Sequence, residues 1–465
     1  MDLFDPADPR PVHFMGIGGA GMSALALVAR RRGVAVSGCD PDPSGAADVA
    51  QLGATVLAGH DPSHVDGVRA VVVTAAVPPE HPELVRARAL GIPVVPRKEA
   101  LAGLVRAGRV VGISGTHGKS TTTVMTTEAL AAAGLDPTGL AGGRVESWGG
   151  NARLGGDRIF VVESDEYDKA FLTLSPSVAV VNNVEADHLE CYGDVPTLEA
   201  AFAEFAGRAG TVLGGADDPG VERVLQAVRR SGGQAVRVWR FGLAADADLR
   251  IAEIEQKAAG SRAKVSLPTG KSVTLELGVP GLHNLRNATA VIGVALALEA
   301  PLDPVLGALA KYRGLGRRFE RLGEAKGIEF VDDYAHHPTE LVATLSAARQ
   351  AFPGRRLIAV FQPHLFSRTA QHGVAMGRAL AVADVAIVTE IYAAREQPLP
   401  GVTGRTVADA AKQAPTSAAV IFEPNRSVVR DRVLEQAKAG DVVITLGAGD
   451  ITKVGRELVA WLRAA

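Results

Sequence analysis

Short apolar runs alternate with longer stretches of helical periodicity along most of this chain. The pattern is clearest over residues 109–130. There a β-branched run at 110–113 is followed by a loop of Gly, Ser and Thr, and a helical pattern begins at Lys119. This order predicts a strand, a loop and a helix, and the helix N-terminus and loop N–H groups would then point at one anion. The stretch therefore predicts a phosphate-binding loop.

The residue types of this loop favour a nucleotide phosphate. Gly115 and Gly118 would let the backbone approach the ligand, Lys119 would add a cation, and the Ser120 hydroxyl would complete the shell of a Mg²⁺ ion. The common version of the motif has another glycine five residues before Gly118, where this chain has Ile113. The run GKSTTT after an apolar strand nevertheless favours nucleotide binding over a simple turn.

The N-terminal stretch shows the same alternation. Residues 12–33 predict a strand, a Gly loop and a helix, and the next predicted strand ends at Asp40. Gly16, Gly18 and Gly21 fit the G-x-G-x-x-G spacing, with an acidic residue about twenty positions later. Such loops hold NAD(P) in some proteins and another nucleotide or a plain turn in others. Further strands at 54–59, 70–77 and 92–97 predict a parallel sheet that ends near residue 108.

Acidic residues follow two predicted strands of the next region. The strand that begins at residue 159 ends at Glu163, and the strand that begins at 178 is followed by Asn183, Asp187 and His188. Ligands of open α/β sheets bind at the carboxyl ends of strands, so Glu163 is predicted as a ligand of Mg²⁺ or its water. His188 fits a ligand or a structural role. The neighbouring carboxylates are interpreted as solvated loop acids: Asp165, Glu166 and Asp168.

The C-terminal third predicts a second doubly wound sheet, with strands within 329–338, 356–364, 385–392, 418–424 and 441–449. Before it, residues 300–304 and 314–323 are interpreted as a linker region. Residues 280–298 predict a helix whose start carries Asn284 and Asn287, which would cap the helix or bind a purine edge. The strand ends carry further polar groups: Asp333, His336, His337, His364, Arg368 and the loop 447–450.

Composition narrows the class of protein. The 465 residues, 47% of them hydrophobic, are enough for two to four packed domains. Lys and Arg total 49 and Asp and Glu total 51, a formal net charge of −2, which argues against nucleic-acid binding through bulk charge. Two cysteines without a pattern suggest a reducing compartment. Because no signal peptide and no membrane span are recognisable, a cytoplasmic location without membrane or nucleic-acid partners is expected.

Several motifs together resemble the Mur ligases. In chain order they are GIGGAGMSALA, GTHGKSTTT, VVESDEYD, NNVEADH, PGLHNLRNA, RRFERLG, DDYAHHPTE, FQPHLFSRT and LGAGDI. The resemblance covers essentially the whole chain from residue 12. It implies three α/β domains: a Rossmann-like domain at 1–107 for a UDP-sugar, a central P-loop ATPase-type domain at 108–314 for ATP and Mg²⁺, and a C-terminal Rossmann-like domain at 315–465 for an amino acid.

The resemblance also implies a reaction. GIGGAGMS, FQPH and GAGDI look most like the family member that joins L-alanine to the lactyl carboxylate of UDP-N-acetylmuramate, through an acyl phosphate, in peptidoglycan precursor synthesis. The implied cofactors are ATP and Mg²⁺, and a monomer or weak homodimer is expected. Three other readings stay open. They are a family member that attaches a recycled peptide, an NAD(P)-dependent dehydrogenase, and a nucleotide-gated binding module.

Residue roles follow from the motif match. Metal ligands would be Ser120, Glu163 and His188, and the groups at the reacting atoms would be Lys119, His188, Asp333 and Arg368. The nucleotide would contact Gly115, Thr116, His117, Gly118, Lys119, Ser120, Thr121, Asn284, Asn287, Arg318 and Asp333. The two remaining substrates would contact Gly18, Gly19, Ala20, Gly21, Asp40, Thr74, Ala75, Ala76, Asn183, Tyr334, His336, His364 and Arg368.

The sequence departs from the family pattern at three places. The phosphate loop reads GKS where GKT is more usual, which keeps the hydroxyl. Leu365 stands where many relatives have arginine, so one anion contact is expected to be missing or supplied elsewhere. Sister ligases carry a carbamylated lysine after the DH motif, but residues 189–215 contain no lysine, so no such modification is expected.

Overall fold

The computed structural model describes residues 2–464 except 231–235, 258–259, 395 and 416–418. Its strands form three sheets, of five, ten and six strands. The chain packs as two compact units, each of which is described by itself below. The first unit is Met1–Glu253, Ala263–Leu275 and Arg286–Lys311, and the second is Ile254–Arg262, Glu276–Leu285 and Tyr312–Ala465.

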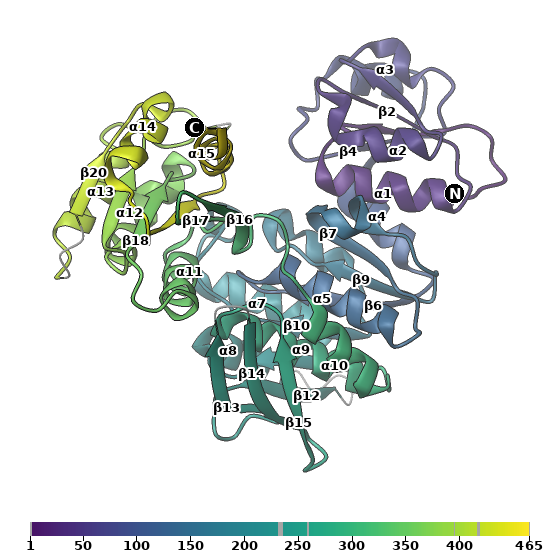
Figure 1. Ribbon diagram of the computed structural model, residues 1–465. Helices are drawn as coiled ribbons and strands as arrows, with labels where there is room; N and C mark the ends of the chain where they lie inside the picture. The colour runs from purple at the N-terminus through teal and green to yellow at the C-terminus, as the bar shows by residue number, and fades with distance from the viewer. Residues whose placement is uncertain (1, 231–235, 258–259, 395, 416–418, 465) are drawn as a thin grey trace. The chain divides into compact units, whose positions relative to one another are not determined.

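The N-terminal sheet is parallel and has the strand order β3-β2-β1-β4-β5. Its strands are β1 (Val12–Met15), β2 (Val36–Asp40), β3 (Thr55–Ala58), β4 (Ala70–Val73) and β5 (Val94–Pro96). Helices α1 (Ala20–Arg31) and α4 (Arg97–Val105) pack in one apolar cluster, and α3 (Pro82–Ala89) packs in another. Figure 1 shows α1 and α3 on opposite sides of β2. Short elements complete this domain: η1 (Pro43–Ala46), α2 (Ala47–Gln51) and η2 (Pro62–Val65).

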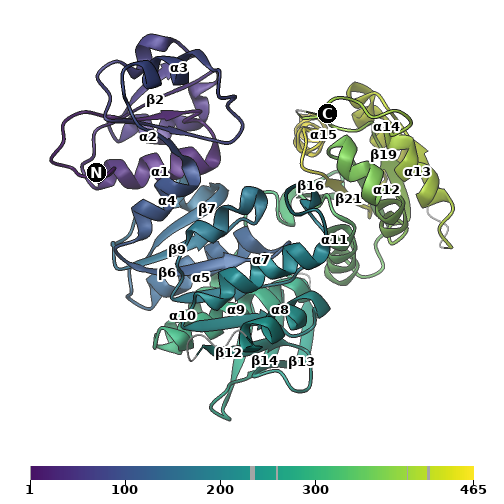
Figure 2. The ribbon, with the colours of Figure 1, turned by 180° about the vertical axis from the view of Figure 1, so that it is seen from behind.

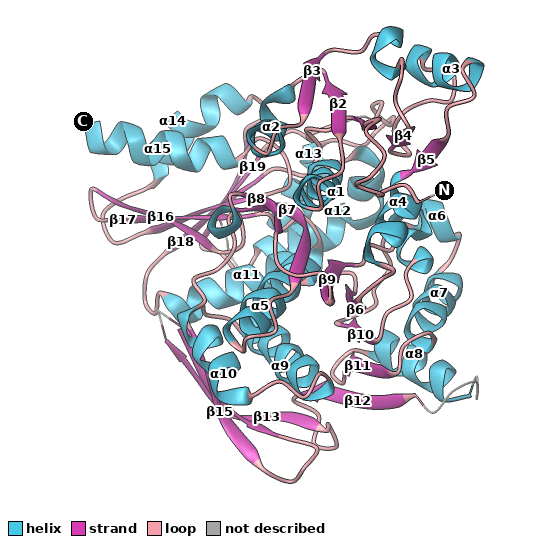
Figure 3. Cartoon of the chain, turned by 90° about the vertical axis from the view of Figure 1, so that its right-hand side faces the viewer, coloured by secondary structure: helices cyan, strands magenta, loops and turns pink. Residues whose placement is uncertain are grey.

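The central sheet has the order β15-β14-β13-β12-β11-β10-β6-β9-β7-β8. The strands nearest the phosphate loop are parallel: β6 (Arg109–Ser114), β9 (Ile159–Glu163), β10 (Val178–Val181) and β11 (Thr211–Gly215). The residues inside these strands are mostly apolar because helices cover both faces. Helix α5 (Lys119–Ala132) lies on one side and helices α7 (Val195–Gly207) and α8 (Pro219–Arg230) lie on the other (Figure 3).

The flanks of this sheet carry elements that the sequence pattern did not predict. At one edge, β8 (Gly150–Arg153) runs antiparallel to β7 (Thr138–Val145). At the other edge lie β12 (Arg237–Gly242), β13 (Leu249–Lys257), β14 (Gly260–Ser266) and β15 (Ser272–Leu277). Short helical turns are η3 (Glu146–Trp148), η4 (Tyr167–Thr173) and α6 (Leu189–Tyr192), and the predicted helix near residue 282 is α9 (Leu282–Ala297).

Part of the predicted linker is helical, which corrects that interpretation. Residues 302–311 form helix α10 (Leu302–Lys311), which packs on α5. Pro301 and Pro304 suggested a linker, but proline is tolerated before a helix and in its first turn, where these two residues lie. Residues at the end of the predicted linker form β16 (Glu320–Ala325), an edge strand that pairs antiparallel with β17 (Ile328–Asp333).

The C-terminal sheet has the order β16-β17-β21-β18-β19-β20 and is parallel apart from β16. Its other strands are β18 (Leu357–Phe361), β19 (Val385–Val388), β20 (Ala419–Phe422) and β21 (Val442–Leu446). Residue 418, where one strand was predicted to begin, lies outside the described residues. The prediction of a doubly wound sheet is otherwise confirmed.

Two apolar clusters cover the two faces of this sheet. Helices α11 (Pro338–Ala351), α12 (Phe366–Leu380) and α13 (Gly404–Lys412) contribute to one cluster, and α14 (Arg426–Gln436) and α15 (Thr452–Ala464) contribute to the other (Figure 2). Because β17, β21 and β18 are neighbours, the loops that follow them meet at one sheet edge. Across the described residues, no helix combines the length and the apolar character that crossing a bilayer requires.

Candidate active site

The phosphate loop lies between β6 and α5, as predicted. Gly115 and Gly118 have φ angles of 129° and 78°, in the region that favours glycine, and Gly118 is the N-cap of α5. A Cβ atom on Gly115 would lie 3.0 Å from Cβ of Asn182, so a larger residue would not fit without movement. Ile113, at the position of the motif's further glycine, is a buried residue of β6.

The end of β10 holds this loop in place. The Thr116 amide donates to the Asn183 carbonyl at 3.0 Å, and the His117 amide donates to Asn183 Oδ1 at 2.7 Å. The Asn183 side-chain nitrogen donates back to the His117 carbonyl at 3.3 Å. The Glu185 amide donates to Thr116 Oγ1 at 2.9 Å. Asn183, expected to contact substrate, therefore orients the phosphate loop itself.

Lys119 is anchored by a buried carboxylate. Its Nζ lies 2.7 Å from Glu166 Oε2 and 2.8 Å from the Gly115 carbonyl, and Asp165 Oδ1 is 3.9 Å away. Burial opposes the charge on Lys119, but Glu166 and Asp165 outweigh it and raise the pKa, so the ammonium stays charged at neutral pH. The interpretation of Glu166 as a solvated loop acid is wrong, because its side chain is only 2% exposed. Neither composition nor spacing distinguished Glu166 from its neighbours.

Ser120 and Glu163 come together beside the loop. The Ser120 hydroxyl donates to Glu163 Oε1 at 2.8 Å, and the Gly142 amide donates to Oε2 at 2.6 Å. Burial raises the pKa of Glu163 despite these two hydrogen bonds and the charge of Lys119. A buried carboxylate and a hydroxyl are hard oxygen donors, and a cation would relieve the cost of burying the carboxylate. The pair therefore fits Mg²⁺ chemistry.

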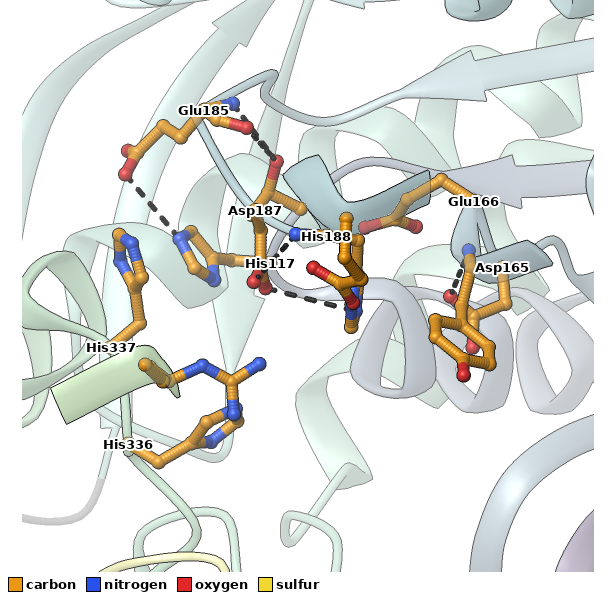
Figure 4. A network of polar contacts seen from close by, with 12 residues as sticks. His117, Asp165, Glu166, Glu185, Asp187, His188, His336 and His337 are labelled. Atoms are coloured by element: carbon orange, nitrogen blue, oxygen red, sulfur yellow. Dashed lines mark hydrogen bonds and ion pairs between the residues drawn. The ribbon is translucent and has the colours of Figure 1, made fainter. Parts of the chain in front are cut away.

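A second group of possible ligands includes Glu166, the ion-pair partner of Lys119. One ligand atom from each of Asp165, Glu166 and His188 lies within 4.8 Å of the others, and the three side chains gather in Figure 4. His188 has a φ angle of 52° and its Nδ1 lies 3.2 Å from Glu190 Oε1. The His188 ring contacts the Tyr167 ring with centroids 5.1 Å apart. This environment fits a metal ligand or an anion-binding imidazole.

Helix α9 brings Asn287 to the phosphate loop. A Cβ atom on Gly118 would lie 2.8 Å from Asn287 Oδ1, so the amide borders the first turn of α5. Asn284 belongs to the other compact unit, and its Nδ2 donates to the Pro280 carbonyl at 2.7 Å. That bond uses one of the two N–H groups of the amide, so the second N–H and the oxygen are the groups that could contact a ligand.

The N-terminal Gly loop follows β1 and lies at the point where the strand order reverses, between β1 and β4, which is where ligands bind in such sheets. The Gly18 amide donates to Asp40 Oδ2 at 3.0 Å, and Asp40 Oδ1 accepts the Asp42 amide at 2.9 Å. Thr74, at the end of β4, accepts the Ala76 amide through its hydroxyl at 3.2 Å. The predicted residues of this loop therefore share one edge of the sheet.

Arg97 is a candidate ligand-binding residue that sequence reasoning missed. A Cβ atom on Gly21 would lie 2.9 Å from its Nη1, which places the guanidinium against the start of α1. Helix α4 begins at Arg97 directly after β5, so the residue stands at the same edge as the Gly loop. Its position after the PVVP run was the only sequence signal.

The C-terminal candidates form a cluster of their own. Asp333 ends β17 and accepts the amides of Phe319 at 2.7 Å and Ala335 at 2.8 Å. Burial raises the pKa of Asp333 to about 6, although the Arg318 charge acts in the opposite direction. The Arg318 guanidinium lies 5.0 Å from the centre of the Tyr334 ring. Asp333 thus orients the turn that carries Arg318.

Three polar side chains face one another beside Asp333. The rings of His336 and His364 are 6.1 Å apart, and Arg368 Nη1 lies 3.5 Å from His364 Nδ1. Burial lowers the pKa of both histidines to about 4, so both imidazoles are neutral at pH 7. Leu365 has a φ angle of 70° and is the N-cap residue of α12, which carries Arg368. A neutral pair of imidazoles with one guanidinium fits a small anionic ligand.

The phosphate loop, its metal-type ligands and the polar strand ends of two further sheets define a nucleotide-dependent α/β enzyme. Matches to three sequence profiles give its family: the Mur ligase family catalytic domain at 11–109, the Mur ligase middle domain at 113–295 and the Mur ligase glutamate ligase domain at 317–449. The chain is 45% identical to a UDP-N-acetylmuramate–L-alanine ligase from Acidothermus cellulolyticus, over 94% of this chain and 91% of that protein. The chain belongs to the Mur ligase family and is an ATP-dependent ligase.

Solved structures share the fold. A UDP-N-acetylmuramate–alanine ligase from Thermotoga maritima is 28% identical, with a TM-score of 0.81 over 98% of this chain and 99% of that one. A murein peptide ligase from Psychrobacter arcticus is 24% identical, with a TM-score of 0.70 over 97% and 98% of the two chains. The expected three-domain α/β architecture is therefore confirmed.

Proposed function

We propose that this chain joins L-alanine to the lactyl carboxylate of UDP-N-acetylmuramate, with ATP as the energy source, in peptidoglycan precursor synthesis. The observation that carries the proposal is the 45% identity, over nearly the full length, to the UDP-N-acetylmuramate–L-alanine ligase from Acidothermus cellulolyticus. The nucleotide-phosphate loop and its buried lysine supply the local chemistry that such a reaction needs.

In the first step, a lactyl carboxylate oxygen attacks the γ-phosphorus of ATP, the bond to the bridging oxygen of ADP breaks, and an acyl phosphate forms. Carboxylate and triphosphate repel each other, so the charge of Lys119 draws both anions to one place. Glu166 holds the ammonium at the loop until the phosphates arrive. Ser120 and Glu163 would hold Mg²⁺, which when bound adds positive charge to the phosphate oxygens. His188 would serve a second metal beside the acyl phosphate.

In the second step, the alanine amine attacks the acyl carbon, the bond to phosphate breaks and an amide forms, while the proton that the nitrogen loses passes to the departing phosphate or to water. Arg368 matches the carboxylate of the amino acid, because a guanidinium binds carboxylates through paired N–H groups. Neutral His336 and His364 offer hydrogen-bonding groups without adding charge beside the amine. Arg318 and Asp333 would contact the nucleotide, and Tyr334 the substrate.

The sugar nucleotide belongs at the N-terminal sheet. The Gly loop, Asp40 and the Thr74–Ala76 turn would surround the UDP group, and Arg97 would pair with its diphosphate. We also propose that the chain divides into domains at 1–107, 108–314 and 315–465, with the sugar nucleotide bound by the first. The proposed protein acts in the cytoplasm as a monomer or weak homodimer. Its partners are its small-molecule substrates, without nucleic acid or membrane.

The test is phosphate release from ATP and Mg²⁺ in the presence of UDP-N-acetylmuramate, scanned over L-alanine, L-serine, glycine, a muropeptide-type tripeptide and no acceptor. Release that requires both the sugar nucleotide and L-alanine is expected. Release that requires the sugar nucleotide and the tripeptide, and does not occur with L-alanine, would favour the ligase that attaches a recycled peptide. Bound ATP without release under any combination would overturn the proposal in favour of a binding module.

A matched pair of lysine variants controls this test. Lys119→Met should abolish phosphate release, because the charge between the two anions is lost. Lys271→Ala changes an exposed lysine in the central domain and should leave release unchanged. Absorbance at the nicotinamide wavelength, followed with NAD(P) in the same assay, tests the dehydrogenase reading.

A further inference from the structure

A cluster of metal-ligand side chains lies in the N-terminal domain, on the face of the sheet that α3 covers. It consists of His13 from β1, Cys39 from β2, three histidines that follow in the chain, and one carboxylate. We call this the histidine–cysteine cluster; its members are His13, Cys39, His60, His64, His81 and Glu83. Ligand-type atoms of His13, Cys39 and Glu83 lie within 4.8 Å of one another, and so do those of His60, His81 and Glu83. None of these residues has a role in the ligase reaction proposed above.

The Cys39 sulfur stands at the centre of the cluster. His13 Nε2 lies 3.4 Å from Sγ, His60 Nδ1 lies 3.2 Å from it, and Glu83 Oε1 lies 3.3 Å from it. His60 Nδ1 is also 3.1 Å from Glu83 Oε2. A thiol has one proton to donate, so it satisfies only one of these three neighbours as a donor. Three polar atoms therefore lie close to Cys39 Sγ, more than a single thiol hydrogen bond accounts for.

The spacing matches that of ligands around a tetrahedral zinc ion. With Zn–S near 2.3 Å and Zn–N near 2.0–2.1 Å, neighbouring ligand atoms lie about 3.4–3.6 Å apart. Four contacts within this set run from 3.1 to 3.4 Å: three reach the Cys39 sulfur, and the fourth joins His60 Nδ1 to Glu83 Oε2. Slight outward movement of these side chains would admit the ion. The mixture of thiol, imidazole and carboxylate is the donor set that zinc selects.

The charge balance of the cluster also points to a cation. Glu83 is fully buried, and within the described residues the ion-pair partners found for it are three histidines, without lysine or arginine. A cation bound between Glu83 and the Cys39 sulfur would offset the buried carboxylate charge and favour loss of the thiol proton.

We propose that the histidine–cysteine cluster binds one zinc-type divalent cation, with Cys39 Sγ, Glu83, His60 Nδ1 and His13 Nε2 as ligands. Outer partners orient two of these ligands: Ser37 Oγ lies 3.0 Å from His13 Nδ1, and His64 Nδ1 lies 2.9 Å from Glu83 Oε1. Partners of this kind fix ligand orientation in zinc sites. The side chains of His60 and His81 are 27% and 19% exposed, which gives the ion a route from solvent.

A cation bound at this site would also affect the Gly loop, because backbone hydrogen bonds join Cys39 to that loop. The Cys39 carbonyl accepts the amides of Gly16 at 2.8 Å and Ile17 at 3.1 Å, and the next residue, Asp40, accepts the Gly18 amide. A cation on Cys39 therefore fixes the strand that supports the loop. The proposed cation therefore has a structural role. Its site is separate from the proposed Mg²⁺ site at the phosphate loop, whose ligands contain no sulfur.

The test uses the full-length chain without an affinity tag, stripped with a chelator and titrated with Co²⁺ as a spectroscopic probe. One Co²⁺ per chain should produce a near-ultraviolet thiolate-to-cobalt charge-transfer band and the visible bands of tetrahedral cobalt. Zn²⁺ should displace the cobalt, remove both features and raise the thermal unfolding temperature. Absence of the charge-transfer band in the wild-type protein would overturn the proposal.

Two cysteine variants form a matched pair. Cys39→Ser should lose the charge-transfer band, whereas Cys191→Ser, which changes the other free cysteine, should keep it. A band that disappears with Cys191→Ser and survives in Cys39→Ser would overturn the assignment. Because Cys39 is buried, a partly exposed ligand gives an independent variant. His60→Ala should weaken Co²⁺ binding about tenfold or more and shift the visible bands. Unchanged affinity and spectrum in His60→Ala would exclude His60 as a ligand and refute the proposed site.

Discussion

The ion pair between Lys119 and Glu166 predicts that one substitution has separable effects on stability and on catalysis. Lys119→Met removes the ammonium and keeps an apolar stem of similar length. It should abolish phosphate release and also destabilise the protein, because Glu166 is then buried without its counter-charge. Adding Glu166→Gln should restore stability without restoring activity, since the charge that draws the substrate anions together remains absent.

The magnitude follows from the geometry. Nζ lies 2.7 Å from Oε2, and the side chains of Lys119 and Glu166 are 14% and 2% exposed, so solvent screens the pair little. Breaking a buried pair by removing one partner costs about 3–5 kcal/mol. Removing both charges is often close to neutral, so the double variant should lie within about 1–2 kcal/mol of the wild-type protein. Glu166→Gln alone should cost less than Lys119→Met, because Asp165 lies 3.9 Å from the ammonium and partly replaces the lost carboxylate.

Urea denaturation of the four proteins measures the first effect, and phosphate release measures the second. Calorimetry with UDP-N-acetylmuramate serves as the control for folding, because the proposed sugar-nucleotide site lies on a different sheet and its affinity should persist in Lys119→Met. Two results would refute the reasoning. One is a Lys119→Met protein as stable as the wild type, and the other is phosphate release by the double variant.

Further predictions concern the other parts of the site. Glu163→Gln should raise the Mg²⁺ concentration needed for half-maximal phosphate release; an unchanged Mg²⁺ dependence would remove Glu163 from the ligand set. Gly115→Ala should weaken ATP binding, measured by calorimetry, by up to about a hundredfold, because the φ of 129° and the contact with Asn182 strain any side chain by about 1–3 kcal/mol. Arg97→Ala should weaken UDP-N-acetylmuramate binding about tenfold or more, as loss of one charged hydrogen bond implies, and leave ATP binding intact. His336 and His364 have pKa values lowered from 6.5 to about 4, so unfolding takes up protons below pH 6.5. The stability contributed by the two histidines should therefore fall between pH 6.5 and pH 4 by up to about 1.4 kcal/mol per pH unit for each; a difference in stability between the wild type and a variant lacking both imidazoles that stays level between pH 7 and pH 5 would contradict this.

The parallel sheets and the phosphate loop could be predicted from local patterns in the sequence. Alternating apolar runs and helical stretches are local signals, and the strand–loop–helix order around Lys119 leaves few other structures for those residues. Antiparallel edge strands such as β16 were missed, because a short strand next to glycine and arginine has no strong pattern of its own. Helix α10 was also missed. Its two prolines suggested a linker, although one precedes the helix and the other lies in its first turn.

Which acids and histidines lie together depends on the tertiary structure. Asp165, Glu166 and Asp168 look alike in sequence, yet only Glu166 is buried against Lys119, because its position depends on how η4 packs against α4 and α7. Cys39 and His60 carried no predicted role until the fold placed them 3.2 Å apart. Local pattern specifies elements through interactions a few residues apart, whereas burial, charge pairing and ligand convergence join residues from distant parts of the chain. Those properties belong to the packed fold.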